Sequence, residues 1–378
     1  MDRMIYLDHA ATTRPFPETV EAMLPFYGKY YGNASSGYEL GEDSKEAMEE
    51  ARQKIADTMG VPKDTIYFTS GGTESNNWVL RQAGEKWRHK GSHIITTRIE
   101  HPAVLKTCGD LEKQGMEVTY LDVDRQGMVN LAQLRRSITR KTILVSIMYA
   151  NNEIGTIQPL REIGRITSRA GVLLHTDAVQ AYGHIPVYPG AFHGDFLTAS
   201  GHKFNGPKGT GFLYIRDKNT LDPWQTGGGQ EKGMRSGTEN IPGIVGLGTS
   251  AEISCRNMQE KITRLCRLRD YMIRRILGEI PGSILNGHPL RRLPGNVNVS
   301  FPGVDGAAVA AMLDLEGICV SSASACSTGS SRPSHVLKAI GRDDRAAYGA
   351  VRMTLGEENT KEEIDITVEK LKKAVSYL

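Results

Sequence analysis

Two residues that end neighbouring strand-like segments carry side chains suited to amine chemistry. Lys203 follows the segment 195–200 and lies in the glycine-rich turn 200–209. Asp177 ends the strand-like segment 171–177. A lysine at the end of a strand can be partly desolvated, which lowers the pKa of its ammonium group and leaves an amine able to form a Schiff base. Taken alone, a lysine in such a place is more often a solvated surface charge.

Asp177 strengthens the chemical interpretation of Lys203, because an acid and a lysine are the pair that pyridoxal 5′-phosphate (PLP) requires. A carboxylate within about 3 Å of a protonated pyridine nitrogen gains roughly 5 kcal/mol at an effective dielectric constant of about 20. That interaction keeps the ring cationic, so that the ring can accept electrons. Gln180 lies at the same strand-to-helix corner as Asp177, where it can reach the neighbouring ring oxygen.

A second candidate site is the glycine turn Gly71-Gly72-Thr73, which lies between a predicted strand and a predicted helix. The backbone N–H groups of such a turn and the dipole of the following helix bind anions, and the Thr73 hydroxyl could add a donor to a phosphate. The alternative is an ordinary helix cap with a glycine turn. The turn lacks the GxxxxGK(S/T) pattern of a nucleotide-binding P-loop, so a nucleotide is not the alternative ligand.

Two further polar positions follow predicted strands. His101 precedes Pro102, a residue suited to the first turn of a helix. A neutral imidazole there could stack on an aromatic cofactor and exchange protons near neutral pH. Asn151 and Asn152 follow a strand that ends at Tyr149, and their amides could donate to a carboxylate or a phenolate oxygen. In isolation, the histidine is better interpreted as a helix cap or a core residue. The two amides are better interpreted as part of a polar turn.

Cys326 lies in a run of small polar residues, SSASACSTGSS at 321–331. Cysteine is usually a small buried residue, but no core is built from such a run. The sequence therefore predicts a long, flexible loop with an accessible thiol. A free thiol with a pKa of about 8.5 is only a few per cent ionised at pH 7, so Cys326 needs a supplied thiolate to act as a nucleophile. Cys319 is expected to pack at the end of a strand.

The overall composition favours a globular protein of two domains. The chain has 378 residues, too many for a typical single core. Hydrophobic residues make up 39% and charged residues 24%, which is typical of a soluble globular protein. The net charge is +3, with both signs interspersed, so the sequence gives no support for nucleic-acid binding.

The sequence also lacks the signals of membranes, disulfides and metals. No signal peptide is recognised at the N-terminus, and no apolar run approaches the roughly 20 residues of a spanning helix. We therefore expect a cytoplasmic protein without membrane contact. The chain has 5 cysteines and no CxxC spacing, so neither a disulfide framework nor a zinc site is expected.

The elements that must position these residues alternate along the chain. Strand-like segments occupy 65–69, 93–97, 117–121 and 142–147, with helical patterns at 44–59 and 160–170. This alternation predicts an α/β fold, with a mostly parallel sheet and helices on both faces. Ligands bind beyond the carboxyl ends of the strands in such sheets, where Asp177 and Lys203 fall.

A smaller domain is predicted in the C-terminal third. A charged amphipathic helix from about 246 to 278 leads into it. Beyond this helix, 297–301 and 319–321 are predicted strands, and 307–316 and 361–377 are predicted helices.

Taken together and in order, ten segments resemble cysteine desulfurases of the NifS/IscS type, which are fold-type I PLP enzymes similar to class-V aminotransferases. The segments are YLDHAATT at 6–13, FTSGGTESNN at 68–77, EHP at 100–102, NNEIGT at 151–156, HTDAVQ at 175–180, SGHK at 200–203, GGGQE at 227–231, RSGTEN at 235–240, SAC at 324–326 and VR at 351–352. They span essentially the whole chain.

The resemblance implies a fold-type I PLP-dependent transferase with two domains. The large PLP-binding domain would comprise residues 15–257 and contain a mostly parallel seven-stranded sheet flanked by helices. A smaller α+β domain would comprise residues 1–14 and 258–378. It would carry the catalytic cysteine loop at about 321–332.

The resemblance also implies roles for the candidate residues. Lys203 would bind PLP as a Schiff base, Asp177 would pair with the ring nitrogen, and Gln180 would bond the ring oxygen. His101 would stack on the ring. Thr238 would enter from the partner subunit of a homodimer with shared active sites. The implied cofactor-binding residues are Gly72, Thr73, His101, Asn152, Asp177, Gln180, Ser200, His202, Lys203 and Thr238.

The implied activity is L-cysteine desulfurase, in which Lys203, Cys326 and His101 are catalytic. Asn152 and Arg352 would hold the substrate carboxylate, for which the arginine fork is a suitable donor. Lys203 would remove the Cα proton, and the Cys326 thiolate would attack the substrate sulfur. L-Alanine would leave. The persulfide on Cys326 would pass to an acceptor protein, such as an iron–sulfur scaffold, for cluster assembly or thiolation.

Other functions remain open at this point. A selenocysteine lyase, or another fold-type I PLP enzyme such as an aminotransferase, would use the same cofactor residues. An aminotransferase, however, has no use for Cys326 in a loop of small residues. A non-catalytic sulfur carrier or assembly partner is the alternative from a different class, and it predicts a protein without a bound chromophore.

Overall fold

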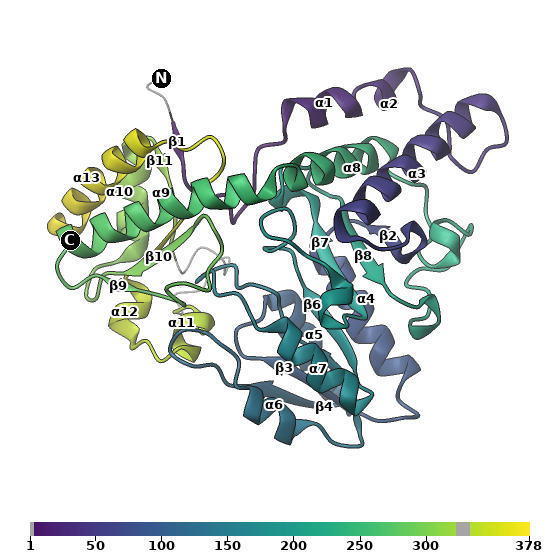
Figure 1. The fold of residues 1–378 in the computed structure, drawn as a ribbon, viewed down its shortest axis with the longest axis horizontal. Helices are drawn as coiled ribbons and strands as arrows, with labels where there is room; N and C mark the ends of the chain where they lie inside the picture. Colours follow the sequence, from purple (N-terminus) through teal and green to yellow (C-terminus); the bar gives the residue numbers. More distant parts are fainter. Residues whose placement is uncertain (1–3, 323–332) are drawn as a thin grey trace.

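A seven-stranded sheet organises the larger part of the computed structural model, which describes residues 4–322 and 333–378 (Figure 1). Its strands are β2 (Ile66–Thr69), β3 (His93–Thr97), β4 (Glu117–Leu121), β5 (Thr142–Ser146), β6 (Leu173–Asp177), β7 (Phe196–Ser200) and β8 (Gly211–Ile215). They lie in the order β2-β8-β7-β6-β5-β3-β4. β8 runs antiparallel to both of its neighbours, and the remaining pairs are parallel. The predicted α/β fold with a mostly parallel sheet is confirmed.

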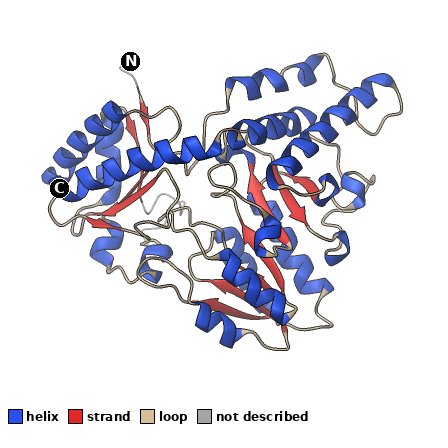
Figure 2. Ribbon diagram, viewed as in Figure 1, coloured by secondary structure: helices blue, strands red, loops and turns tan. Residues whose placement is uncertain are grey.

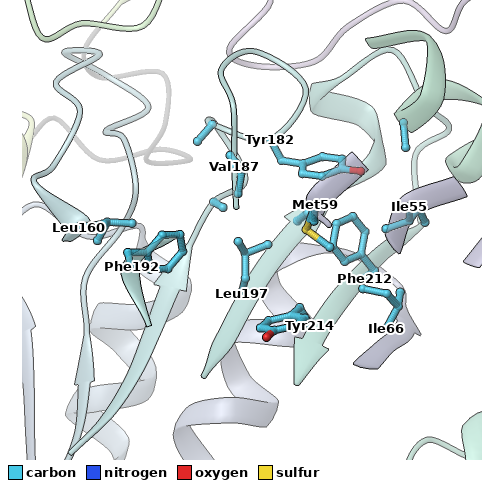
Figure 3. Close-up of a cluster of buried hydrophobic side chains, with 14 of the residues drawn as sticks. Ile55, Met59, Ile66, Leu160, Tyr182, Val187, Phe192, Leu197, Phe212 and Tyr214 are labelled. Carbon is cyan, nitrogen blue, oxygen red and sulfur yellow. The ribbon is translucent and has the colours of Figure 1, made fainter. Parts of the chain in front are cut away.

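Helices cover both faces of this sheet, which explains why β2, β3, β5, β7 and β8 are buried along their whole length (Figure 2). On one face, α4 (Gly72–Lys86) and α5 (Pro102–Lys113) contribute Trp78 and Val104 to a buried cluster. On the other, α3 (Glu39–Met59) and α7 (Leu160–Ala170) pack over the sheet. Figure 3 shows that core, with Met59, Leu160 and Leu197 among its side chains. The remaining helices of this part are α1 (Pro17–Met23), α2 (Pro25–Gly28), α6 (Leu131–Ser137) and α8 (Ile241–Cys255).

A second, smaller part is built around a four-stranded sheet of the described residues. In the order β12-β13-β10-β9, its strands are β12 (Ser321–Ser322), β13 (Ala350–Thr354), β10 (Asn296–Ser300) and β9 (Ile284–Leu285). Its helices are α9 (Met258–Glu279), α10 (Gly306–Leu315), α11 (His335–Ala339), α12 (Asp344–Tyr348) and α13 (Lys361–Tyr377). The N-terminal β1 (Ile5–Tyr6) pairs with β11 (Ile318–Cys319), and Ile5 and Leu7 belong to this second core. The boundaries 15–257, and 1–14 with 258–378, stay a prediction.

Short 3-10 turns connect several of these elements. They comprise Lys63–Thr65, Pro189–Phe192, Gly201–Lys203, Lys218–Thr220 and Glu231–Gly233. The turn after β7 contains Lys203, so this residue leaves the sheet at the carboxyl end of a strand, as predicted.

The single long helix predicted from 246 to 278 is wrong, because the structure divides it into α8 and α9. Arg256 is extended, and Asn257 has a φ of 52°. Asparagine is one of the few residues that tolerate this left-handed conformation. The two helices belong to different cores, with Leu247 of α8 in one and Met272 of α9 in the other. Hydrophobic residues continue on both sides of the break, so the periodicity does not reveal it.

The strand predicted at 319–321 is also wrong as a single element. β11 ends at Cys319 and pairs with β1, whereas β12 begins at Ser321 and pairs with β13. Val320 joins the two strands because their hydrogen-bond partners lie in different sheets. Burial raises the pKa of the Cys319 thiol, but the residue is only partly buried, so its packing role stays a prediction. Residues 321 and 322 were expected to begin the cysteine loop but form β12 instead.

Candidate active site

A cavity of about 720 Å³ lies beyond the carboxyl ends of β6 and β7. Its volume is in the range of sites that bind small molecules. The sequence-predicted residues that line it are Gly72, Thr73, His101, Asn152, Asp177, Gln180, Ser200, His202, Lys203 and Arg352. Thr238 is not among the lining residues, and Cys326 lies outside the described residues. The fold therefore brings together residues that are 280 positions apart in the chain, from Gly72 to Arg352.

Asp177 is a buried carboxylate whose two oxygens are both fixed. Its Oδ2 accepts a hydrogen bond from Asn76 Nδ2 at 2.7 Å, and its Oδ1 accepts one from the Val179 backbone N–H at 3.0 Å. Asn76 lies one turn after Thr73 on α4 and also lines the cavity. Sequence reasoning gave Asn76 no role, although it lies within the quoted glycine-turn segment. The result is an oriented acceptor at the cavity wall, suited to a cationic ring nitrogen.

Lys203 lies against the N-terminal segment of the chain. Its Nζ donates to the backbone oxygens of Ala10 and Ala11, at 2.7 Å each. Gln180 Nε2 donates to the same Ala10 oxygen at 3.0 Å. Behind the site, His184 Nε2 donates to the backbone oxygen of Lys203 at 2.8 Å. The segment 6–13, which had no role beyond the family resemblance, therefore forms one wall of the site and orients the amine.

His101 has two tasks that the sequence presented as alternatives. It precedes α5 as the capping residue, and its Nδ1 accepts a hydrogen bond from the Ala103 N–H at 3.1 Å. The ring also lines the cavity. Desolvation lowers the pKa of His101, with Asp177 opposing the shift and Lys203 adding to it. A neutral ring that accepts at Nδ1 carries its proton on Nε2, and so presents a donor.

The start of α4 is a glycine turn that lines the cavity. Gly71 has a φ of 145°, which favours glycine, and a Cβ on Gly72 would lie 2.7 Å from a Val179 methyl carbon. Glycine at position 72 therefore lets this turn pack closely against Val179. The first N–H groups of α4 have no acceptor within the helix, and its dipole favours an anion. Thr73 and Ser200 add hydroxyl donors to the same cavity.

His202 completes this side of the cavity. Burial lowers the pKa of its ring to about 4, with contributions from Lys203 and Lys208. The ring is therefore a neutral hydrogen-bonding group at pH 7. Its Nδ1 lies 3.2 Å from the Thr12 hydroxyl, so the N-terminal segment holds His202 as well as Lys203.

Arg352 provides the cation on the opposite side. It is a buried residue of β13, and its Nη2 pairs with Asp8 Oδ1 at 2.8 Å. Its Nη1 donates to the Asn152 backbone oxygen at 3.1 Å. Burial raises the pKa of Asp8, and Arg352 opposes that shift. Asp8 was missed as a site residue, although it lies in the quoted N-terminal segment.

Thr238 is exposed on the surface of a single chain and lies in a segment tied to the start of α4. Arg235 Nε donates to Glu74 Oε1 at 2.7 Å, and Glu74 Oε2 accepts from the Ser70 N–H at 2.8 Å. The structure of one chain thus does not bring Thr238 to its own cavity.

Residues 4–322 and 333–378 contain no group of three or more histidine, cysteine, aspartate or glutamate side chains arranged to hold a metal ion. In the same part of the chain, no helix is both long and apolar enough to cross a membrane.

Comparison with known proteins gives consistent matches over the whole chain. Residues 5–367 match the class-V aminotransferase family. The chain is 49% identical over 377 residues to the cysteine desulfurase IscS of Methanosarcina thermophila, covering 100% of this chain and 93% of that protein. It is 47% identical to the cysteine desulfurase IscS of Dictyoglomus turgidum, with coverages of 100% and 96%.

Solved structures agree with these sequence matches. A NifS-like protein aligns with a TM-score of 0.94 at 40% identity, covering 100% of both chains. The apo cysteine desulfurase of Thermococcus onnurineus NA1 aligns with a TM-score of 0.89 at 28% identity, covering 99% of this chain and 95% of that one. The chain therefore belongs to the class-V aminotransferase family and, within it, to the cysteine desulfurases of the NifS/IscS type.

Proposed function

We propose that this protein is an L-cysteine desulfurase that uses PLP and produces L-alanine and enzyme-bound sulfur. The observation that carries the proposal is the cavity between the sheet and Arg352. The Lys203 amine, the Asp177 carboxylate and the start of α4 surround a single space there, which supports the proposal. The family relationship makes cysteine the substrate.

The donor set of the cavity fits PLP. Asp177 is oriented to pair with the ring nitrogen, and the N–H groups at the start of α4 suit the phosphate group. Gln180 lines the same cavity as Asp177, where it would bond the ring oxygen, and His101 is a neutral ring able to stack. Lys203 supplies the amine that binds the cofactor. When bound, PLP supplies an electron sink that stabilises negative charge on the substrate α-carbon.

The chain's own residues perform the remaining tasks. Arg352 and Asn152 bind and orient the substrate carboxylate. Lys203 accepts the proton from the substrate α-carbon, since its amine lines the same cavity as Arg352 and Asn152. His101 donates from Nε2 to groups that gain negative charge.

Sulfur transfer is assigned to Cys326. Its thiolate attacks the substrate sulfur, so that a sulfur–sulfur bond forms and the carbon–sulfur bond breaks. The electron pair of the broken bond stays on the carbon fragment, which takes up a proton and leaves as L-alanine. The persulfide then passes to a sulfur-acceptor protein, for which an iron–sulfur scaffold is one candidate.

The assembly we propose is a homodimer with shared active sites. Thr238 is exposed and outside the cavity of its own chain, which suits a residue that completes the phosphate site of a partner subunit. We also assign the protein to the cytoplasm as part of this proposal.

The experiment that tests the function measures products and cofactor together. With L-cysteine and a dithiol, the purified protein should be yellow and release alanine and sulfide in equal amounts. Lys203→Ala should lose the visible absorbance and the turnover, whereas Lys218→Ala, an exposed lysine of a 3-10 turn, should keep both. Keto-acid-dependent amino transfer without sulfide would instead indicate an aminotransferase. Turnover of selenocysteine alone would indicate a lyase, and a colourless protein a non-catalytic carrier.

A further inference from the structure

The start of α11 contacts the two turns that carry His101 and Asn152. Ser334 Oγ donates to Glu153 Oε2 at 2.5 Å. The next residue, His335, donates from Nε2 to the backbone oxygen of Glu100 at 3.0 Å. Each acceptor is therefore the immediate neighbour of a proposed site residue. Ser334 and His335 follow the segment that contains Cys326 in the chain.

The turn that contains Asn152 is held on several sides. Asn151 Oδ1 accepts from the Glu153 N–H at 2.9 Å, and the backbone oxygen of Glu153 accepts from Asn298 Nδ2 at 3.1 Å. Arg352 donates to the oxygen of Asn152 itself. Because these bonds involve main-chain atoms, a displacement of Glu153 also displaces Asn152 and the acceptor of the arginine.

The two turns and α11 share one small core. Asn151 Nδ2 donates to the Ile99 oxygen at 2.9 Å, which joins the turn after β5 to the turn after β3. The buried cluster beneath them contains Ile99, Met148, Ile154, Val336, Leu337 and Ile340. α11 thus packs on the site-bearing turns as well as following the Cys326 segment.

Ser334 has two hydrogen-bonding tasks with a single hydroxyl. Its oxygen caps α11 by accepting from the N–H groups of Val336 and Leu337, at 3.1 and 3.3 Å. Its proton is donated to the carboxyl group of Glu153, a buried residue that is 5% exposed. An alanine at this position would leave the buried Glu153 carboxyl without this donor, which costs more than the bond itself contributes.

We propose that Ser334 and Glu153 are positioning residues for the substrate carboxylate site, because their bond fixes the Asn152 main chain against Arg352. The inference rests on the proposed function and deepens it. It also gives the segment after Cys326 a direct contact with the turn that binds substrate.

The kinetic test uses Ser334→Ala, with Ser334→Thr as the conservative rescue. In the holoenzyme, Ser334→Ala should raise the KM for L-cysteine about tenfold, with kcat within about twofold and the cofactor absorbance unchanged. Ser334→Thr should restore the KM because it keeps the hydroxyl. Asp343→Ala is the matched control. It removes the cap of α12, a helix of the same length, and Asp343 has no hydrogen bond to either turn among the described residues.

A second measurement does not depend on activity. Hydrogen exchange in the cofactor-free protein should be faster across 148–156 in Ser334→Ala and unchanged there in Asp343→Ala. If Ser334→Ala fails to fold, Glu153→Gln takes its place. Its KM and its exchange rates are then compared with those of Ser334→Thr. Equal effects of Ser334→Ala and Asp343→Ala on KM and on exchange would overturn the inference. If the wild type makes no alanine, the proposed function fails, and the exchange comparison alone decides the positioning role.

Discussion

At the scale of single residues, the site depends on polar groups whose orientation is fixed by neighbours distant in sequence. The Asp177 carboxylate is bonded by Asn76, 101 residues away, and the Arg352 guanidinium pairs with Asp8, 344 residues away. The shared position of Asp177 and Lys203 at one cavity was predictable because each follows or ends a strand, and strand ends converge in a parallel sheet. Asn76 and Asp8 were not, because no local pattern specifies partners at such separations.

Asp177→Asn tests the charge that we assign to the cofactor nitrogen. The amide keeps the size of the side chain but removes its negative charge, so the ring should accept electrons less well. We expect kcat to fall by at least about a hundredfold, measured per bound cofactor so that occupancy is controlled. Asp222→Asn, on the surface, should leave kcat unchanged. If the kcat of Asp177→Asn stays within about threefold of the wild-type value, this role is contradicted.

At the scale of elements, a buried ion pair anchors the segment that carries Thr238. Arg52 of α3 makes two hydrogen bonds to Glu231, at 2.9 and 2.8 Å, and both residues are buried. Glu231 Oε2 also accepts from the Phe68 N–H in β2 at 2.8 Å. Glu231 and Lys232 have positive φ values of 47° and 59°, which the anchor holds in place.

Glu231→Gln should therefore destabilise the fold strongly. It leaves the Arg52 charge buried without its carboxylate partner, at a cost of about 3–5 kcal/mol in the free energy of unfolding. Glu49→Gln provides the comparison, because Glu49 also bonds Arg52 but its side chain is 31% exposed. That change should cost about 0–1 kcal/mol. Denaturant unfolding of both variants checks the difference, and equal costs would disprove the anchoring role.

The sequence predicted elements well where periodicity and burial coincide. Helix α7 and strand β3 have the expected bounds, because most of their apolar residues are buried. Strand β4 also has the expected bounds, although Leu121 is its one buried residue. It failed at Asn257 and Val320, where the chain passes from one core or sheet to another without a change in hydrophobic pattern. Such changes of partner are set by tertiary contacts, which a local pattern does not contain.

At the scale of the whole molecule, the proposed dimer predicts complementation between subunits. Lys203→Ala and Thr238→Ala chains should each form weakly active or inactive homodimers. A mixed dimer with one chain of each kind has one complete site if Thr238 acts in the partner's cavity. Its activity should therefore be about half that of the wild type.

The control for this experiment places both substitutions on the same chain. A wild-type chain paired with the double variant Lys203→Ala/Thr238→Ala has no complete site if Thr238 acts across subunits. It should therefore stay impaired. The reverse result, an active wild-type/double-variant dimer and an impaired dimer of single variants, would place Thr238 in the site of its own chain.

The central claim is that Lys203 prepares a carbon–sulfur bond for cleavage and Cys326 takes the sulfur. The most direct measurement is a single turnover with L-cysteine and no added reductant, followed by mass analysis of the peptide containing residue 326. The account predicts one alanine per active site and the mass of one extra sulfur atom on Cys326. Cys326→Ser should give neither the alanine nor the added sulfur mass, whereas Cys319→Ser should give both. Full turnover by Cys326→Ser, with the sulfur released directly from cysteine, would contradict it.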